Sequence, residues 1–257
     1  SETVEITRID KNAPTILVTG GSTGANPLIL NISAANPGGS GVTVTVQKDN
    51  GEPQIIQDDT YAVTESGTYT FTAVTGAGLT AAETVTVYQV TFASAYGAAP
   101  SAVLVRSGGT ISEPTVPTQA GYTFDGWYND ETAWNFGADM VTDDLTLTAK
   151  WTLNAPRVTL NSAPEGASGT YNGGQPVVTL TAAPSHDAGS GITYTYRWYK
   201  GETPLDGKTG AELTLADVAD SGSYYVEVTA GDGTLTSRRA ASSAPVMVTI
   251  DPKLLTV

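Results

Sequence analysis

The chain has 257 residues, no cysteine and a formal net charge of −14 at pH 7. The absence of cysteine excludes disulfides, thiolate zinc sites and cysteine nucleophiles. Its 26 aspartate and glutamate residues outnumber 12 lysine and arginine residues. The chain therefore lacks the basic surface that attracts nucleic acids and anionic lipid headgroups, and we expect neither a nucleic-acid partner nor membrane insertion of this segment.

Alternation of threonine with apolar residues runs through most of the chain. It begins with VTVTVQ at residues 42–47 and returns at residues 68–74, 83–90, 145–151 and 223–230. A period of two with β-branched and aromatic residues predicts strands, and the Gly, Pro, Asn and Asp clusters between these runs predict turns. No stretch has the sustained apolar spacing of an amphipathic helix. The sequence therefore predicts an all-β fold class.

Two segments with a common pattern precede predicted strands. Residues 63–74 read VTESGTYTFTAV and residues 218–229 read VADSGSYYVEVT, and each has an acid, a glycine two residues later and a tyrosine two residues after that. The pattern resembles the turn before strand F of immunoglobulin-like domains, where the tyrosine hydroxyl bonds upstream backbone. The resemblance implies tyrosine corners at Tyr69 and Tyr224, each within an immunoglobulin-like β-sandwich.

The middle of the chain carries a different series of motifs. A Gly-Gly turn at residues 108–109 is followed by GYTFDGWY at residues 121–128 and by LTLTAKW at residues 145–151. Together they resemble the Listeria–Bacteroides repeat, the B-repeat of internalins and many other bacterial surface proteins. The resemblance implies a compact, β-grasp-like module that is usually strung with others along a secreted or wall-attached protein.

Residues 121–136 gather six aromatic side chains. A small module needs large side chains to bury enough apolar surface, so we interpret these aromatics first as core. A carbohydrate site is the alternative, because apolar sugar faces stack on indole while neighbouring acids bind hydroxyls. Its candidate ligand-binding residues are Trp134, Trp127 and Asp130. Trp134 lies in the polar stretch NDETAWNFG and is the tryptophan that we expect to be exposed.

The last part of the chain resembles bacterial immunoglobulin-like modules more fully. GQPVVTLTAAPS at residues 174–185 is similar to strand B, and YRWYKGETPL at residues 196–205 is similar to strand C, with Trp198 as its buried tryptophan. In disulfide-bearing relatives a cystine joins strands B and F beside that tryptophan. In this chain Ala182 and Val226 occupy the matching places, so apolar side chains are expected to fill the space.

No motif points to catalysis. The single histidine, His186, lies in the stretch PSHDAGSG, where a solvated turn residue is favoured over a general base. The stretch GGSTG at residues 20–24 opens no predicted helix, so a loop is favoured over a phosphate cradle. Acidic turns at residues 49–51, 58–59 and 143–144 could offer oxygens to calcium, but none has a ligand-loop spacing. We predict no catalytic residue, no cofactor and no metal site.

The predicted organisation is a row of modules joined by short connectors. Its parts are a sandwich over residues 1–88, the β-grasp-like repeat over residues 89–152, a sandwich over residues 153–252, and a tail or start of a further segment over residues 253–257. The connectors at residues 87–90 and 151–156 contain no flexible Gly/Ser run, so the modules should form a semi-rigid rod. We expect the chain to be part of a longer protein.

These features predict a non-catalytic, extracellular segment of a bacterial surface or adhesin-like protein, on the cell surface or secreted. Its expected role is a semi-rigid modular stalk that presents or supports binding. Two alternatives stay open: a module that binds a glycan or a host cell-surface protein, and an accessory region of a secreted polysaccharide-degrading enzyme. Nothing in the sequence specifies the oligomeric state.

Overall fold

The computed structural model describes residues 11–163, 167–234 and 239–254. Within these ranges the elements are strands, apart from η1 (Val218–Asp220), a single turn of 3-10 helix. The predicted all-β class is confirmed. Predictions for residues 1–10, where the first module was expected to begin, and for residues 255–257 of the terminal segment lie outside the described residues.

The chain divides into two compact units. One comprises residues 1–117 and 126–150, and the other comprises residues 118–125 and 151–257. The division passes through the module that the sequence predicts over residues 89–152. The three-module organisation therefore stays a prediction.

The first unit contains a small antiparallel sheet. It consists of β1 (Thr15–Gly20), β2 (Leu28–Ala35) and β5 (Thr60–Val63), with β2 in the centre. Every second residue of β2 from Leu28 to Ile32 is buried, because successive side chains of a strand point to opposite faces. This buried row is one wall of the core of the first unit.

An eight-stranded sheet has the order β10-β9-β11-β7-β6-β3-β4, with β8 paired to β7. The bounds of its strands are β3 (Val42–Lys48), β4 (Gln54–Ile56), β6 (Gly67–Thr75), β7 (Thr80–Ala93), β8 (Val103–Arg106), β9 (Tyr122–Asn129), β10 (Thr132–Ala133) and β11 (Leu145–Leu153). Val46, Phe71 and Val85 from this sheet pack with the buried row of β2 and complete the core. The β-grasp likeness of the middle module stays a prediction.

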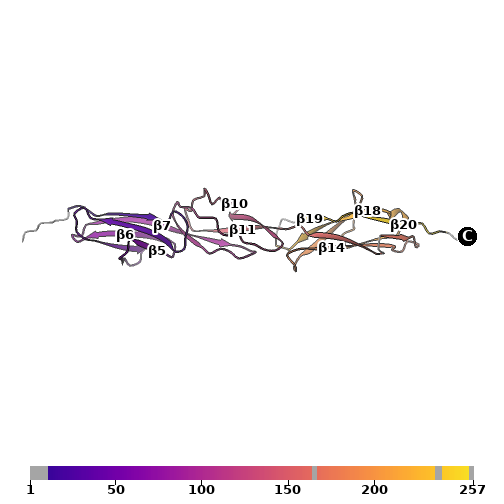
Figure 1. Cartoon of the computed structure of the whole chain (residues 1–257), viewed down its shortest axis with the longest axis horizontal. Coiled ribbons are helices and arrows are strands. Elements are labelled where there is room, and N and C mark those ends of the chain that lie inside the picture. Colours follow the sequence, from indigo (N-terminus) through magenta and orange to yellow (C-terminus); the bar gives the residue numbers. More distant parts are fainter. Residues whose placement is uncertain (1–10, 164–166, 235–238, 255–257) are drawn as a thin grey trace, which may run out of the picture. The chain divides into compact units, whose positions relative to one another are not determined.

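The strand β7 belongs to the first predicted module and to the middle one without a break. Its residues Thr80–Val87 pair with β6, the strand beside it in Figure 1. Residues Val87–Val90 pair with β8, and Val90–Ala93 run parallel to β11. The predicted connector at residues 87–90 is therefore a hydrogen-bonded part of a sheet rather than a linker.

The second unit contains a sandwich of two sheets. One sheet consists of β12 (Arg157–Ala163), β14 (Val178–Ser185) and β17 (Glu212–Leu215). The other has the order β13-β20-β18-β15-β16, with β19 paired to β18. Its strands are β13 (Ser168–Thr170), β15 (Thr193–Lys200), β16 (Thr203–Pro204), β18 (Gly222–Gly231), β19 (Arg239–Ser242) and β20 (Val246–Asp251). Figure 1 shows β14 and β18 in different layers.

Trp198 lies at the centre of this second core. Its side chain is fully buried, and its indole Nε1 donates a hydrogen bond to the backbone oxygen of Gly210 at 2.9 Å. Ala182 and Val226 are buried in the same cluster. The expected strand-C tryptophan is confirmed, and apolar side chains occupy the places that a cystine holds in disulfide-bearing relatives.

Candidate functional site

Two of the six aromatic side chains in residues 121–136, Trp127 and Phe124, lie in edge-to-face pairs. Trp127 is 2% exposed, and its ring centroid lies 5.0 Å from that of Phe92. In the second unit, Phe124 and Trp151 pair in the same way at 5.4 Å. Edge-to-face contacts at such separations are favourable for aromatic rings. Trp127 is therefore a core residue, and its ring is not accessible to a ligand in this structure.

The other two candidate ligand-binding residues belong to a tight hairpin. β9 turns into β10 through Asp130 and Glu131, and Asp130 has a φ of 51°, a left-handed conformation that such turns use. The backbone N–H of Trp134 donates to the oxygen of Trp127 at 2.8 Å. Asp130 is exposed, whereas Trp134 is half-buried and less accessible than the sequence suggested. Ligand binding by these residues stays a prediction.

The exposed side of the same hairpin carries a small charged cluster. The Lys150 ammonium lies 2.6 Å from the Glu131 carboxylate and 4.4 Å from the centroid of the Tyr128 ring. The hydrogen bond from Lys150 lowers the pKa of Glu131. An ammonium over an aromatic ring is a favourable contact, but Glu131 is solvent-exposed and water screens the ion pair. The cluster orients side chains without making a buried site.

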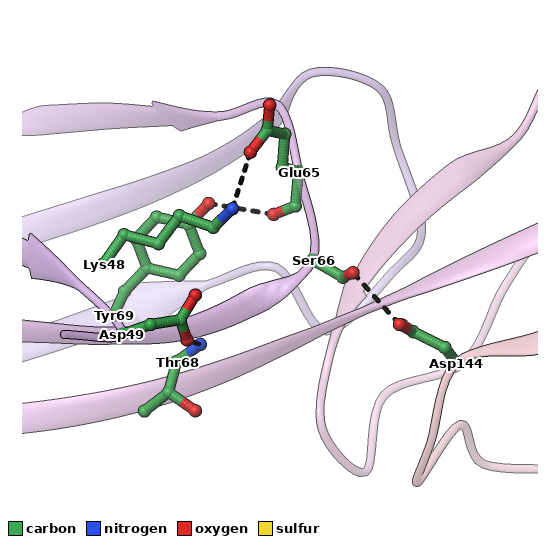
Figure 2. A network of polar contacts seen from close by, with 7 residues as sticks. All are labelled: Lys48, Asp49, Glu65, Ser66, Thr68, Tyr69 and Asp144. Atoms are coloured by element: carbon green, nitrogen blue, oxygen red, sulfur yellow. Dashed lines mark hydrogen bonds and ion pairs between the residues drawn. The ribbon is translucent and has the colours of Figure 1, made fainter. Parts of the chain in front are cut away.

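Both predicted tyrosine corners are present. The Tyr69 hydroxyl donates to the backbone oxygen of Glu65 at 2.9 Å, as Figure 2 shows, and the Tyr224 hydroxyl donates to the backbone oxygen of Asp220 at 2.5 Å. Desolvation by burial raises the pKa of Tyr69, and it raises the pKa of Tyr224 to about 12. Each hydroxyl is thereby held in its neutral, donating form.

In each corner the side chain of a lysine packs against the glycine, a contact that the sequence pattern did not reveal. Lys200 pairs across the sheet with Tyr224, and its ammonium donates to the backbone oxygen of Ala219 at 2.6 Å. A Cβ atom on Gly222 would lie 2.8 Å from the Cε of Lys200. Lys48 crosses the glycine of the first corner in the same way and forms an ion pair of 2.6 Å with the acid of that corner.

Comparison with known families decides the nature of the middle module. Residues 88–150 match the sequence model of the Listeria-Bacteroides repeat domain. This part of the chain is similar to the Listeria–Bacteroides repeat. The resemblance carried by GYTFDGWY and LTLTAKW is confirmed, with bounds within two residues of those expected.

Longer similarities extend beyond the repeat. Internalin H of Listeria monocytogenes is 29% identical over 194 residues, which cover 69% of this chain and 34% of that protein. A protein of Evansella cellulosilytica named "Putative membrane protein" is 37% identical over 112 residues, which cover 42% of this chain and 15% of that protein. The chain thus spans only a minor part of the length of these relatives. Among solved structures, the four N-terminal Ig domains of Dscam1 isoform 7.44 align over 93% of this chain and 99% of that one, at 12% identity and a TM-score of 0.26.

Backbone hydrogen bonds fasten the loop at residues 21–25 to the repeat; we call this set of contacts the first joint. Two of the bonds join Ala25 and Leu104 through N–H and oxygen in both directions, at 2.9 and 2.8 Å. The others run from the N–H groups of Gly24, Thr110 and Arg106 to oxygens of Thr110, Ser22 and Gly21, at 2.9, 2.9 and 2.8 Å. The predicted loop at GGSTG is confirmed, but its part in a ladder with the repeat was not foreseen.

The Asp144 side chain adds a second fastening to the first joint. Its Oδ1 accepts the backbone N–H of Gln89 at 2.6 Å, and its Oδ2 accepts the Ser66 hydroxyl at 3.1 Å. Figure 2 shows that Ser66 reaches Asp144 from the turn that also carries the first tyrosine corner. This contact connects the corner turn of the sandwich with the turn before β11 of the repeat.

A comparable set of contacts, the second joint, surrounds Asn154 in the second unit. The Asn154 N–H donates to the oxygen of Gly121 at 2.9 Å, and its Oδ1 accepts the Thr123 hydroxyl at 2.6 Å. A His186 ring nitrogen lies 2.7 Å from the Asn154 oxygen. A Cβ atom on Gly121 would overlap the backbone nitrogen of Ala188, so the two backbone segments touch. His186 lies in the predicted turn, but it is bonded rather than freely solvated.

The described residues form no cluster that could hold a metal ion, and acidic side chains considered for calcium make structural hydrogen bonds instead. In residues 11–163, 167–234 and 239–254, no group of three or more His, Asp or Glu side chains is arranged to hold a metal ion. Of the acidic turns considered for calcium, Asp49 accepts the N–H of Thr68 at 2.8 Å and Asp144 binds in the first joint. None of the helical segments in the described part of the chain is long and apolar enough to cross a membrane.

Proposed function

We propose that this chain is a non-catalytic, extracellular segment of a bacterial cell-surface or secreted protein and acts as a semi-rigid modular stalk. The match to the Listeria–Bacteroides repeat and the similarity to an internalin support placement at the bacterial surface. In this role the segment presents or supports a binding region in an adhesin-like protein. A semi-rigid stalk must resist bending at the places where its modules meet. The hydrogen bonds of the first and second joints oppose such bending.

The first joint is the observation that carries this proposal. β7 passes from pairing with β6 to pairing with β8 and β11 without a break. The ladder between residues 21–25 and the repeat ties a second segment across the same place. Bending there requires several backbone hydrogen bonds to break together. Leaving buried or partly buried backbone groups without a hydrogen-bond partner costs free energy, so the bent state is disfavoured.

A spin-label measurement tests the stiffness of the first joint. Because the chain has no cysteine, Ala77→Cys and Thr132→Cys place labels at two exposed positions, one on the sandwich and one on the repeat. We expect a narrow distance distribution that Gly109→Ala broadens, since a Cβ there would lie 2.6 Å from the Ser22 oxygen and 2.9 Å from the Arg106 oxygen.

The matched control is Gly41→Ala, because a Cβ on Gly41 meets no heavy atom within 4 Å. It should leave the distribution narrow. A broad distribution in the unmodified, doubly labelled chain would overturn the stalk proposal. Labelling of intact cells with an antibody against this segment tests the surface location separately.

A glycan- or protein-binding hairpin is the second candidate. It is favoured by the Nε1 of Trp134, which is buried without a hydrogen-bond partner among the described residues, and by the exposed Asp130 nearby in the hairpin. A glycan array probed with the intact chain and with Trp134→Ala tests it. Binding that disappears in the folded variant supports this function, and binding that is unchanged rules out the hairpin as its site.

A further inference from the structure

A groove of about 570 Å³ opens in the first unit where the chain crosses from one sheet to the other. Its walls are the end of β2 at Ile32–Ala34 and the start of β3 at Val42–Val44, and its floor and rim are residues 55–59. Pockets that hold ligands usually measure about 300–1,000 Å³. The groove therefore has room for a short piece of extended chain.

The wall formed by β2 has backbone groups for which the described residues supply no hydrogen-bond partner. The Ile32 N–H donates to the oxygen of Asp59 at 2.7 Å, which shows that the backbone groups of Ile32 face the β5 side. Backbone groups of a strand alternate in direction, so those of Ala34 face the same side. β5 pairs with β2 only along Leu28–Asn31. Beyond Asp59 the neighbouring chain has left β2, and the N–H and oxygen of Ala34 face the groove.

The wall formed by β3 shows the same feature. Val44 pairs with Ile56 and Val46 pairs with Gln54 in the hairpin of β3 and β4. The Asp49 N–H turns the other way and donates to β6 at 2.7 Å, so the even-numbered residues of β3 direct their backbone groups to the β4 side. β4 ends at Ile56. The backbone groups of Val42 consequently face the groove from the wall opposite Ala34.

At the outer edge of β1, in contrast to the groove, side chains bond the backbone groups of the strand. There the Val18 N–H donates to the Glu83 carboxylate at 2.7 Å, and the Val18 oxygen accepts from the Arg106 guanidinium at 2.8 Å. Side chains thus occupy an edge that would otherwise attract a foreign strand, a common protection of exposed sheets. The groove has no comparable cover among the side chains that line it.

The rim of the groove favours a basic occupant. Asp58 and Asp59 are exposed at the rim, and Ile55 beside them is 62% exposed. We propose that the groove binds, by strand addition, an extended segment of another protein in which lysine or arginine alternates with β-branched residues. The guest backbone pairs with Ala34 on one wall and with Val42 on the other, and its basic side chains meet the two aspartates. A second copy of this chain is disfavoured, because each copy carries a net charge of −14.

A blocked synthetic peptide that alternates lysine and threonine with valine is the probe, added to the isotopically labelled whole chain. We expect backbone amide shifts confined to the lining residues, with the largest at Ala34 and Val42. Ala34→Pro removes the donor at a position whose N–H has no ladder partner, so the sheet should tolerate it while peptide binding weakens by about tenfold or more. The peptide with glutamate in place of lysine should not bind.

A second pair of variants keeps the test decisive if Ala34→Pro does not fold. Asp58→Asn with Asp59→Asn should weaken binding severalfold and reduce its dependence on salt. Glu52→Gln with Glu113→Gln makes the same change in charge at exposed positions outside the groove and should leave binding unchanged. Absence of binding at millimolar peptide, equal binding of the glutamate peptide, or amide shifts centred elsewhere would each overturn the proposal.

Discussion

The imidazole of His186 lies 2.7 Å from the backbone oxygen of Asn154 through Nε2, and its Nδ1 accepts the N–H of Ala188 at 3.0 Å. Because Nδ1 accepts the Ala188 N–H, Nε2 is the ring nitrogen that can donate to the Asn154 oxygen. The only histidine of the chain therefore fastens the residue that directly follows β11. The imidazole is thus a structural part of the second joint.

Removal of the imidazole should loosen the second joint. His186→Ala removes the acceptor of the Ala188 N–H and the ring nitrogen beside the Asn154 oxygen. At constant pH the amide of Ala188 should therefore exchange faster in this variant than in the unmodified chain. Asp187 is the charged residue next to His186, and its hydrogen bond with Arg157 at 2.6 Å lowers the pKa of Asp187.

His186→Gln supplies the control for this substitution. A glutamine amide can still donate to the Asn154 oxygen, so exchange at Ala188 should be faster in this variant than in the unmodified chain but slower than in His186→Ala. Equal exchange at Ala188 in all three proteins would mean that the imidazole does not hold the joint.

Alkaline pH should destabilise the second unit through Tyr224. Burial raises the pKa of Tyr224 from its ordinary value to about 12, so the folded state holds this proton more tightly than the unfolded state does. The stabilising contribution is complete below the unfolded pKa of about 10 and is lost as pH rises toward 12, with a slope of at most about 1.4 kcal/mol per pH unit. Urea unfolding between pH 8 and pH 11.5 measures this slope.

Tyr224→Phe should remove that contribution and, at neutral pH, cost about 1 kcal/mol for the lost hydrogen bond to Asp220. Burial also raises the pKa of Tyr69 in the first unit, so that unit should lose stability at alkaline pH as well. The unfolding transitions of the two units must therefore be followed separately. An unchanged alkaline slope of the second transition in Tyr224→Phe would contradict the assignment.

Gly222→Ala should lower the stability of the second unit by about 1–3 kcal/mol, the usual cost of a strained backbone conformation. Gly222 has a φ of 154°, and the added Cβ would meet the Lys200 stem at 2.8 Å. Lys200→Ala in the same chain should recover only the steric part, because the backbone strain remains. Gly210→Ala is the control, since its Cβ would make only contacts of 3.8 Å or more. Full recovery by Lys200→Ala would mean that the glycine is needed for space alone.

Local patterns predicted much of the fold. Alternating residues identified the strands around Tyr69 and Tyr224, since burial on one face of a sheet imposes a period of two on the sequence. The corner pattern even predicted the hydroxyl bonds of these tyrosines. Trp198 was recognised through the resemblance of residues 196–205 to strand C of immunoglobulin-like domains, whose tryptophan fills the core of the sandwich.

The same patterns could not predict contacts between segments that lie far apart in the sequence. The loop at residues 21–25 pairs with residues about eighty positions later, and its small polar residues have no periodicity that could name a partner. Its glycines suggested a turn, but neighbouring side chains also leave little space there: a Cβ atom on Gly24 would lie 2.7 Å from Cγ2 of Ile111. Trp134 shows the converse error: its polar sequence neighbours suggested exposure, but the hairpin with Trp127 draws it partly into the module.

Asp144→Ala tests how much the first joint contributes to the stability of the first unit. It removes the acceptor of the Gln89 N–H and of the Ser66 hydroxyl. Hydrogen bonds to a charged acceptor contribute about 1.5–3 kcal/mol when shielded, and Gln89 is exposed, so we expect a loss of about 1 kcal/mol and faster amide exchange at Gln89.

Ser66→Ala removes only the hydroxyl contact and should cost less than Asp144→Ala. Asp144→Asn keeps an oxygen for Gln89 and should fall between the two, because the acceptor loses its charge but not its position. If Asp144→Ala and Ser66→Ala were equally stable with equal exchange at Gln89, the short contact with the Gln89 N–H would contribute nothing. The resistance of the first joint to bending would then depend on β7 and on the ladder with residues 21–25.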